Sequence, residues 1–210
     1  MPDARTDILG RVRTALRGTQ PDPDPVAAPP GAQPDAPAGA AGLVARFAER
    51  VADYRATVVR CGPAELSAAV ADALPAGARV AVPPGLPDDV RGALAEAVVD
   101  DGLTPQQLDA VDAVVTTCRV AIAETGTIVL DHQPDQGRRV LTLVPDRHVC
   151  IVRADQVVAD VPDAVAVLDP TRALTWISGP SATSDIELDR VEGVHGPRQL
   201  HVVVVEGPQA

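Results

Sequence analysis

Hydroxyl and carboxylate side chains crowd the stretch ISGPSATSDIE, which directly follows the strand-like run LTWI. In open α/β sheets, ligands bind beyond the carboxyl ends of strands, where loops lead into helix N-termini. Gly179 permits close approach of the backbone to a ligand, and Pro180 stiffens the turn. One interpretation is therefore a cradle for an anionic ligand. Its candidate ligand-binding residues are Ser178, Gly179, Ser181, Thr183, Ser184, Asp185 and Glu187.

The same stretch also fits the start of a helix. Thr183 or Ser184 is a favourable N-cap, and SDIE has the form of a capping box, with Ser184 as the cap and Glu187 at the third helical position. In this alternative, the hydroxyls and acids only satisfy the helix end. A helix N-terminus also presents free N–H groups to an anion, so the cap and the cradle are compatible.

A second candidate is Glu124 in the run AETGTIVL, where a carboxylate stands among apolar residues. The neighbouring Thr125 and Gly126 mark a point where a strand should kink or bulge. Glu124 is either exposed on the polar face of the strand or buried with a partner. Burial would raise its pKa and make it a candidate general base or acid. We expect Glu124 to share a hollow with the loop that begins at Ser178.

Histidines and arginines supply the remaining candidates. His148 stands at the head of the strand-like run HVCIV and is a second catalytic candidate, and His195 with Gly196 lies in the loop GVHGPR. The two histidines either converge on a site or are structural. Arg138 and Arg139 are adjacent in the loop DQGRRV and either clamp a carboxylate or phosphate or are solvated.

Composition excludes several classes of function. The chain has 210 residues and contains no lysine, so Schiff-base chemistry and a P-loop lysine are ruled out. Its net charge of −11 argues against binding to nucleic acid or to an anionic membrane surface. No segment has the length and hydrophobicity of a membrane span or the apolar core of a signal peptide. We therefore expect a cytoplasmic protein.

Cofactor signatures are also missing from the sequence. The three cysteines, Cys61, Cys118 and Cys150, are far apart in the sequence and form no C-x-x-C motif, which excludes a local zinc ribbon or iron–sulfur motif and indicates reduced thiols. No H-x-x-x-H spacing fixes a metal. We expect no metal and no cofactor.

Alternation of apolar patterns predicts the elements that position these side chains. Residues 1–18 form a helix, and residues 19–41 form a flexible linker rich in proline and alanine. Residues 42–207 form an α/β domain with an open, mixed, largely parallel sheet flanked by helices. Strands are expected at 57–61, 79–82, 113–116, 121–130, 140–145, 148–154, 174–178 and 199–206, and helices at 43–54, 62–74, 87–100 and 162–168.

Four motifs in this order resemble the lactate-utilisation protein C family, also called the LUD domain family. They are AIAETGTIVL, GRRVLTLVPDRHVCIVRADQVV, ISGPSATSDIE and GVHGPRQLHVVVV. The resemblance implies a fold similar to the sugar-phosphate isomerase and CoA-transferase group. It also implies a role in bacterial oxidation of L-lactate to pyruvate, beside partner subunits that carry iron–sulfur clusters and cysteine-rich domains.

Two functions therefore compete. The first is an accessory subunit that binds a small carboxylate, a phosphate or its redox partners, with Glu124 and His148 shaping the pocket. The second, inferred from fold kinship alone, is a free-standing ligase or acyl-transfer enzyme related to 5-formyltetrahydrofolate cyclo-ligase. A small-molecule sensor without catalysis is a third, weaker option.

Overall fold

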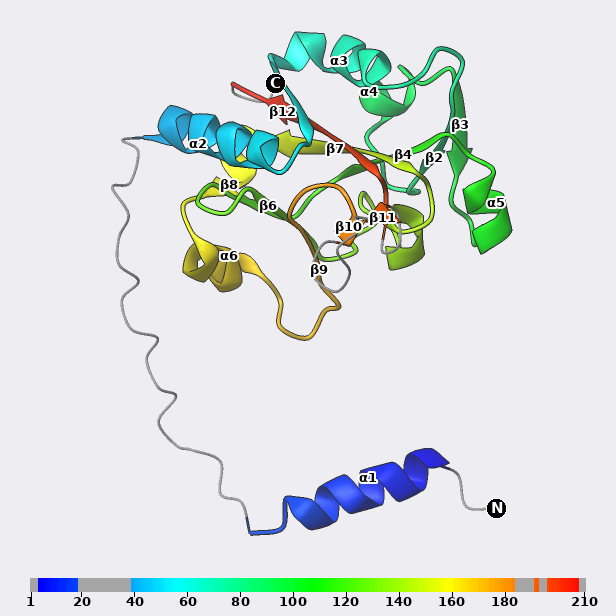
Figure 1. Ribbon diagram of the computed structural model, residues 1–210, viewed down its shortest axis with the longest axis vertical. Helices are drawn as coiled ribbons and strands as arrows, with labels where there is room; N and C mark the ends of the chain where they lie inside the picture. The colour runs from blue at the N-terminus through cyan, green and yellow to red at the C-terminus, as the bar shows by residue number, and fades with distance from the viewer. Residues whose placement is uncertain (1–3, 19–38, 184–190, 193–195, 208–210) are drawn as a thin grey trace. The chain divides into compact units, whose positions relative to one another are not determined.

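The computed structural model describes residues 4–18, 39–183, 191–192 and 196–207 (Figure 1). The chain divides into two units, Met1–Pro34 and Asp35–Ala210. Most of the expected linker lies outside the described residues. In the first unit, one helix and the turn that follows it present four exposed apolar side chains, and no residue of this helix is buried. The four are Ile8, Leu9, Val12 and Leu16.

The helix of the first unit is α1, and the second unit alternates strands and helices from α2 onward. The elements in chain order are α1 (Ala4–Ala15), α2 (Ala40–Asp53), β1 (Thr57–Cys61), η1 (Pro63–Glu65), α3 (Leu66–Asp72), β2 (Arg79–Val82), α4 (Asp88–Arg91), β3 (Glu96–Val99), α5 (Pro105–Asp109), β4 (Ala113–Thr117), β5 (Val120–Ile122), β6 (Thr127–Leu130), η2 (Arg139–Thr142), β7 (Arg147–Arg153), η3 (Ala154–Gln156), β8 (Val157–Val158), α6 (Val161–Val167), β9 (Thr175–Ile177), β10 (Ala182–Thr183), β11 (Val191–Glu192) and β12 (Gln199–Val205).

The main sheet has six strands in the order β1-β12-β7-β4-β2-β3, and every pairing in it is parallel. The central strands read as near-continuous runs of valine and isoleucine because both faces of the sheet are covered. The expected α/β class, with a largely parallel sheet flanked by helices, is confirmed.

Alternate residues of these strands face two different cores. On one face, α3 and α4 bury Val70 and Val90 against the sheet. On the other face, α2 buries Val44, Phe47 and Val51 in a second cluster. Figure 1 shows α2 on one side of the β12 and β7 ribbons, and α3 with α4 on the other side.

A second sheet carries the antiparallel pairings. Its order is β8-β5-β6-β9, with β5 and β9 antiparallel to β6 and β8 parallel to β5. Its inner face shares the core of α2 through Ile128 and Leu130, and α6 covers its outer face with Ala164. The mixed character that the sequence predicted thus belongs to a separate small sheet, which lies over the main one.

Three local expectations were wrong. The predicted bulge at Gly126 is a hairpin turn between β5 and β6, in which Gly126 takes a φ of 60°. The predicted helix 87–100 ends at Arg91, because the chain turns at Gly92, and the β-branched Val98 and Val99 then pair with β2 at the sheet edge. The predicted strand 140–145 is instead η2, a short 3₁₀ helix that buries Leu141.

Candidate functional site

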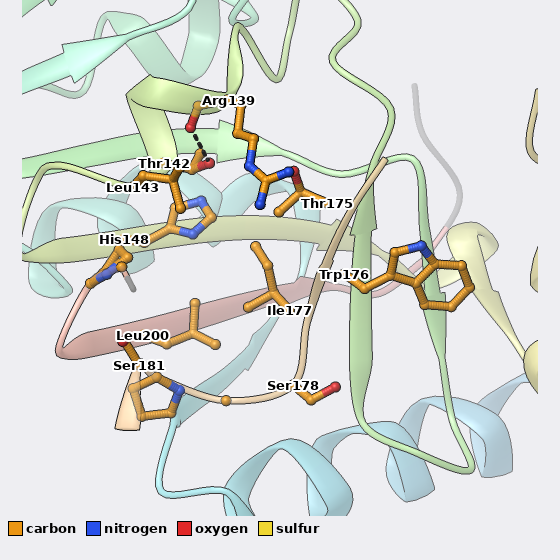
Figure 2. Close-up of a pocket in the computed structure, with 14 residues that line it drawn as sticks. Arg139, Thr142, Leu143, His148, Thr175, Trp176, Ile177, Ser178, Ser181 and Leu200 are labelled. Carbon is orange, nitrogen blue, oxygen red and sulfur yellow. Dashed lines mark hydrogen bonds between the residues drawn. The ribbon is translucent and has the colours of Figure 1, made fainter. Parts of the chain in front are cut away.

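A cavity of about 280 Å³ opens between the main sheet, the small sheet and η2. β9 and the loop that follows it form one wall, η2 forms a second, and the ends of β7 and β12 form the floor (Figure 2). The lining residues are Arg139, Thr142, Leu143, His148, Thr175, Trp176, Ile177, Ser178, Gly179, Pro180, Ser181, Gly196, Pro197 and Leu200.

This position differs from the one predicted by the rule for open α/β sheets. His148 and Leu200 are partners in the register of β7 and β12, and both stand near the amino ends of these parallel strands. The cavity therefore lies over the face of the main sheet at its amino-terminal side. The reason is that β9, the strand that leads into the hydroxyl-rich loop, belongs to the small sheet.

The loop after β9 turns sharply because Gly179 has a φ of 87° and touches α2. A Cβ atom at Gly179 would lie 2.6 Å from the Cβ atom of Tyr54, so no larger residue fits without moving the helix end. The backbone N–H of Ser181 donates to the carbonyl of Pro197 at 2.8 Å, which ties the loop to the chain that enters β12. The predicted loop thus does form one wall of a hollow.

The adjacent arginines Arg138 and Arg139 differ in whether their guanidinium groups are paired. Arg138 donates through Nε and Nη2 to the two carboxylate oxygens of Asp100, both at 2.7 Å. The Asp100 side chain is only 2% exposed, and this pairing lowers its pKa and raises the pKa of Arg138. Arg138 therefore anchors its loop to the end of β3, and it does not line the cavity.

Arg139 lines the cavity and is exposed at its rim. Among the described residues, its guanidinium has no hydrogen bond and no ion pair. Figure 2 shows the guanidinium pointing inward, between the ring of His148 and Thr175. The cavity lining contains no Asp or Glu, so this positive charge is uncompensated within the hollow.

His148 forms part of the cavity floor and is buried, with 1% of its surface exposed. Its Nε2 atom lies 2.9 Å from the hydroxyl of Thr116, which is itself fully buried. Burial lowers the pKa of the imidazole to about 4, so the ring is neutral at neutral pH. A neutral histidine beside an unpaired arginine leaves the cavity with one positive charge.

Thr175 is held from behind by His132. The Nε2 atom of His132 lies 3.0 Å from the Thr175 hydroxyl, and its Nδ1 atom lies 2.9 Å from the carbonyl of Gly137. His132 takes a φ of 59°, which is unusual for a residue other than glycine. It thereby links β9 to the loop that carries Arg139.

Glu124 does not line the cavity, so the expected hollow shared with the Ser178 loop is wrong. Glu124 is exposed in the β5–β6 turn, and its backbone N–H donates to Ala159. Thr125 reaches the loop indirectly: its hydroxyl donates to Thr127 at 2.8 Å, and Thr127 lies 2.8 Å from the Ser178 hydroxyl. Gly126 packs against the backbone of Arg50 in α2, where a Cβ atom would meet it at 2.7 Å.

Some sequence candidates cannot be placed relative to the cavity. Ser184, Asp185, Glu187 and His195 lie outside the described residues, so the predicted capping box does too. Thr183 belongs to β10, which pairs with β11. Of the remaining candidates, the cavity brings together six: Arg139, His148, Ser178, Gly179, Ser181 and Gly196.

Sequence reasoning missed Thr116, His132 and Thr175. Thr175 could have been found, because strand alternation places Thr175 and Ile177 on the face opposite Trp176. Thr116 and His132 act from behind lining residues, and their roles depend on contacts between strands that are distant in sequence. No local signal identifies such pairs.

The part of the chain that the structure describes has neither a cluster of metal ligands nor a membrane-spanning helix. There, no three His, Cys, Asp or Glu side chains gather closely enough to hold a metal ion. None of the described helices combines the length and the apolar character needed to cross a bilayer. Cys61, Cys118 and Cys150 are buried free thiols.

The lining can bind an acceptor-rich, negatively charged small molecule. Arg139 supplies charge, the serines and His148 supply polar atoms, and Ile177 and Leu200 supply an apolar surface. At about 280 Å³ the cavity lies at the lower end of the range for ligand sites. A small acid suits this volume better than a nucleotide does.

Known proteins resemble this chain in sequence and in fold. The family described as the LUD domain matches residues 44–205. A protein named Lactate utilization protein C from Deinococcus radiodurans is 46% identical over 208 residues, covering 97% of this chain and 96% of the relative. Another of that name from Bacillus licheniformis is 36% identical over 100 residues, covering 44% of this chain and 41% of the relative. The crystal structure of a DUF162 family protein from D. radiodurans superposes with a TM-score of 0.69 at 43% identity, covering 81% of this chain and all of the other.

Proposed function

Because the chain belongs to the LUD domain family, we propose that it is an accessory subunit of a bacterial lactate-utilisation system and that its cavity binds a small carboxylate. Its relatives in D. radiodurans and B. licheniformis carry the name Lactate utilization protein C. The family relation supports the pathway, and the cavity supports the kind of ligand.

The observation that carries the proposal is the uncompensated charge of Arg139. The whole chain has a net charge of −11, so its surface repels anions in general. Within the described residues, Arg139 stands in a hollow with no acidic lining residue and no ion-pair partner. A guanidinium in this setting favours a planar carboxylate, which it can bind with two hydrogen bonds.

The neutral state of His148 limits the charge that the cavity accepts. With its pKa near 4, the ring adds no positive charge at neutral pH. One cation matches a monocarboxylate better than a doubly charged phosphate. The site is therefore proposed to favour a monoanion.

Electron transfer is assigned to partner subunits. The chain has three cysteines, fewer than the four thiolates that commonly hold an iron–sulfur cluster. We propose that iron–sulfur and cysteine-rich lactate-utilisation subunits carry the electrons, as the family resemblance implies. This chain would then bind the organic acid or help to assemble the complex.

Genetics provides the test of the pathway. Deleting the gene in a host that grows on L-lactate should abolish that growth and leave growth on pyruvate intact. The wild-type gene should restore growth, and an Arg139→Gln gene should not. Normal growth of the deletion strain on L-lactate would refute the assignment.

Binding measurements test the cavity separately. Calorimetric titration of the full chain with lactate, pyruvate, propionate and inorganic phosphate should show binding of the monocarboxylates that Arg139→Gln weakens. Phosphate bound more tightly than every monocarboxylate would contradict the proposed ligand class.

A further inference from the structure

The cavity beside β9 is larger than a three-carbon acid requires. A water molecule in the liquid occupies roughly 30 Å³, so a cavity of about 280 Å³ has the volume of roughly nine waters. Each carbon or oxygen atom of an organic acid, with its hydrogens, fills a volume similar to that of a water molecule. A three-carbon monocarboxylate therefore fills roughly half of the cavity and leaves the rest to water.

The walls of the cavity do not close around a smaller ligand, because two of them belong to the packed core. Leu200 is 4% exposed and lies in the core cluster that α2 covers, and Ile177 packs against the same cluster. Ile177 is also held in register with Ile128 of β6. Close-packed interiors of this kind are rigid on average. The volume that a small acid leaves empty is therefore filled by water that lies against apolar side chains.

Charge and apolar surface lie in different parts of the cavity. Figure 2 shows the guanidinium of Arg139 flanked by His148 and Thr175, which together form a polar end. In the same view, Ile177 and Leu200 lie between this polar end and the loop that follows β9. A ligand whose carboxylate pairs with Arg139 thus meets apolar side chains along the rest of its length.

We propose that the cavity binds a medium-chain monocarboxylate of about six to eight carbons, whose carboxylate pairs with Arg139 and whose apolar tail lies along Ile177 and Leu200. The inference rests on the proposed function, since it names the ligand class of the same site. Each methylene group that leaves water for an apolar wall raises affinity about fourfold. A three-carbon acid uses the same arginine but leaves this apolar surface uncovered, so it binds more weakly.

Calorimetric titration of the full chain with straight-chain carboxylates from acetate to decanoate is the experiment. The association constant should rise about fourfold for each methylene up to hexanoate, so hexanoate should bind about sixtyfold more tightly than propionate. Beyond octanoate the affinity should level off, because further carbons extend into solvent. Equal affinities for propionate and hexanoate would overturn the proposal.

Alcohols of the same length test whether the carboxylate is held. 1-Hexanol has the tail of hexanoate without its charge, so it should bind about tenfold to a hundredfold more weakly. Arg139→Gln should remove most of this difference by weakening hexanoate alone. If hexanol bound the wild type as tightly as hexanoate does, the tail would be adsorbing to an apolar surface without the arginine, and the proposal would fail.

Ile177→Thr tests the apolar wall. Threonine keeps the branched Cβ atom that suits β9 and exchanges apolar surface for a hydroxyl, so hexanoate should weaken about tenfold and acetate should be unchanged. Val59→Thr, at an exposed strand position outside the cavity, is the matched control and should change neither acid. Thermal melts establish that each variant is folded.

Leu143→Ala provides a second variant in case Ile177→Thr does not fold. Leu143 lines the cavity at the end of η2 and is only partly buried, so its truncation opens the wall without emptying the core. It should also weaken hexanoate and leave acetate unchanged. A ratio of hexanoate to acetate affinity that stays at the wild-type value in the folded variants would contradict the proposed position of the tail.

The outcomes distinguish this inference from the function on which it rests. If short and long acids bind equally well in an Arg139-dependent way, the proposed tail is wrong and the anion site stands. If no acid binds, or if Arg139→Gln has no effect on any acid, both fail.

Discussion

Two hollows of this protein have comparable volumes and both contain arginine, but their arginines are paired differently. The cavity beside β9 measures about 280 Å³, and a second hollow, lined by Arg119, Val120, Arg153, Asp155, Gln156, Val158 and Val167, measures about 350 Å³. In the second hollow, Arg153 pairs with Asp155 at 2.7 Å, and Arg119 donates to the carbonyl of Val167 at 3.1 Å. Its arginines are satisfied by the protein itself.

The difference shows that volume alone does not identify a binding site. In the second hollow, Arg153 is paired with Asp155, and Arg119 bonds to the carbonyl of Val167 and lies 3.9 Å from an Asp131 carboxylate oxygen. In the cavity, Arg139 has no partner among the described residues, and His148 keeps one nitrogen open. A ligand contributes the missing partners, so the cavity is the better candidate despite its smaller volume.

The largest expected effect concerns His148, which has no equivalent in the second hollow. Its pKa is about 4 in the folded protein and near 6.5 when unfolded. Between these values the unfolded chain binds more protons, so stability should be fully present above pH 6.5 and fall by about 3 kcal/mol as the pH drops to 4. Urea titrations across this range measure the slope.

A His148→Gln protein provides the comparison. It should lose most of the slope between pH 6.5 and 4, whatever its stability at pH 7. His201, whose pKa is also lowered by burial and by Arg147, is present in both proteins and cancels. Equal slopes for the two proteins would mean that His148 is not buried as a neutral base.

The next effect concerns ligand affinity. Arg139→Gln should weaken lactate binding by about tenfold to a hundredfold, because it removes a charge-assisted pair worth about 1.5–3 kcal/mol. The matched change Arg153→Gln should leave lactate binding unchanged. Calorimetry on both variants decides between the hollows, and the reverse result would make the second hollow the site.

Stability should separate the two adjacent arginines. Arg138→Gln leaves the buried Asp100 carboxylate without its two strongest hydrogen bonds and should cost about 1–3 kcal/mol of unfolding free energy. Arg139→Gln should change it by less than about 0.5 kcal/mol. Similar losses in the two variants would show that Arg139 also has a structural partner.

The smallest effect is expected in the second hollow. Arg153 and Asp155 are 42% and 64% exposed, and an ion pair this exposed contributes little. Arg153→Gln should therefore lower the unfolding free energy by at most about 0.5 kcal/mol in chemical denaturation. A loss above about 1 kcal/mol would mean that this pair is part of a larger network.

Apolar runs predicted most of the main sheet. Strands such as HVCIV and LHVVVV have no polar face, and this pattern fits a parallel sheet that is covered on both sides. The wrong predictions of secondary structure arose in short segments whose apolar residues fit both the spacing of a helix and the spacing of a strand. Residues 96–99 fit a helical spacing, but the turn at Gly92 and the β-branched Val98 and Val99 decided for an edge strand.

Part of the candidate site could also be predicted from local sequence patterns. The Ser178–Ser181 loop was found because serine, glycine and proline after a strand indicate a tight turn. The sequence could not predict that Arg138 is paired while Arg139 faces the cavity. The partner of Arg138 is Asp100, which is distant in the sequence and is brought next to this loop by folding. Glu124 was misplaced for a related reason: the hairpin at Gly126 turns its side chain outward, and a strand with a bulge would not have done so.

The contacts of α2 with Gly126 and Gly179 have a consequence for how this family can diverge. The last turns of the helix leave no room for a Cβ atom at either glycine, because Arg50 and Tyr54 approach within 2.8 Å of each hypothetical position. In related chains, a side chain at either glycine is therefore expected only together with a shortened or displaced helix end. The end of α2, the turn at Gly126 and the turn at Gly179 are therefore expected to change together, although they are far apart in the sequence.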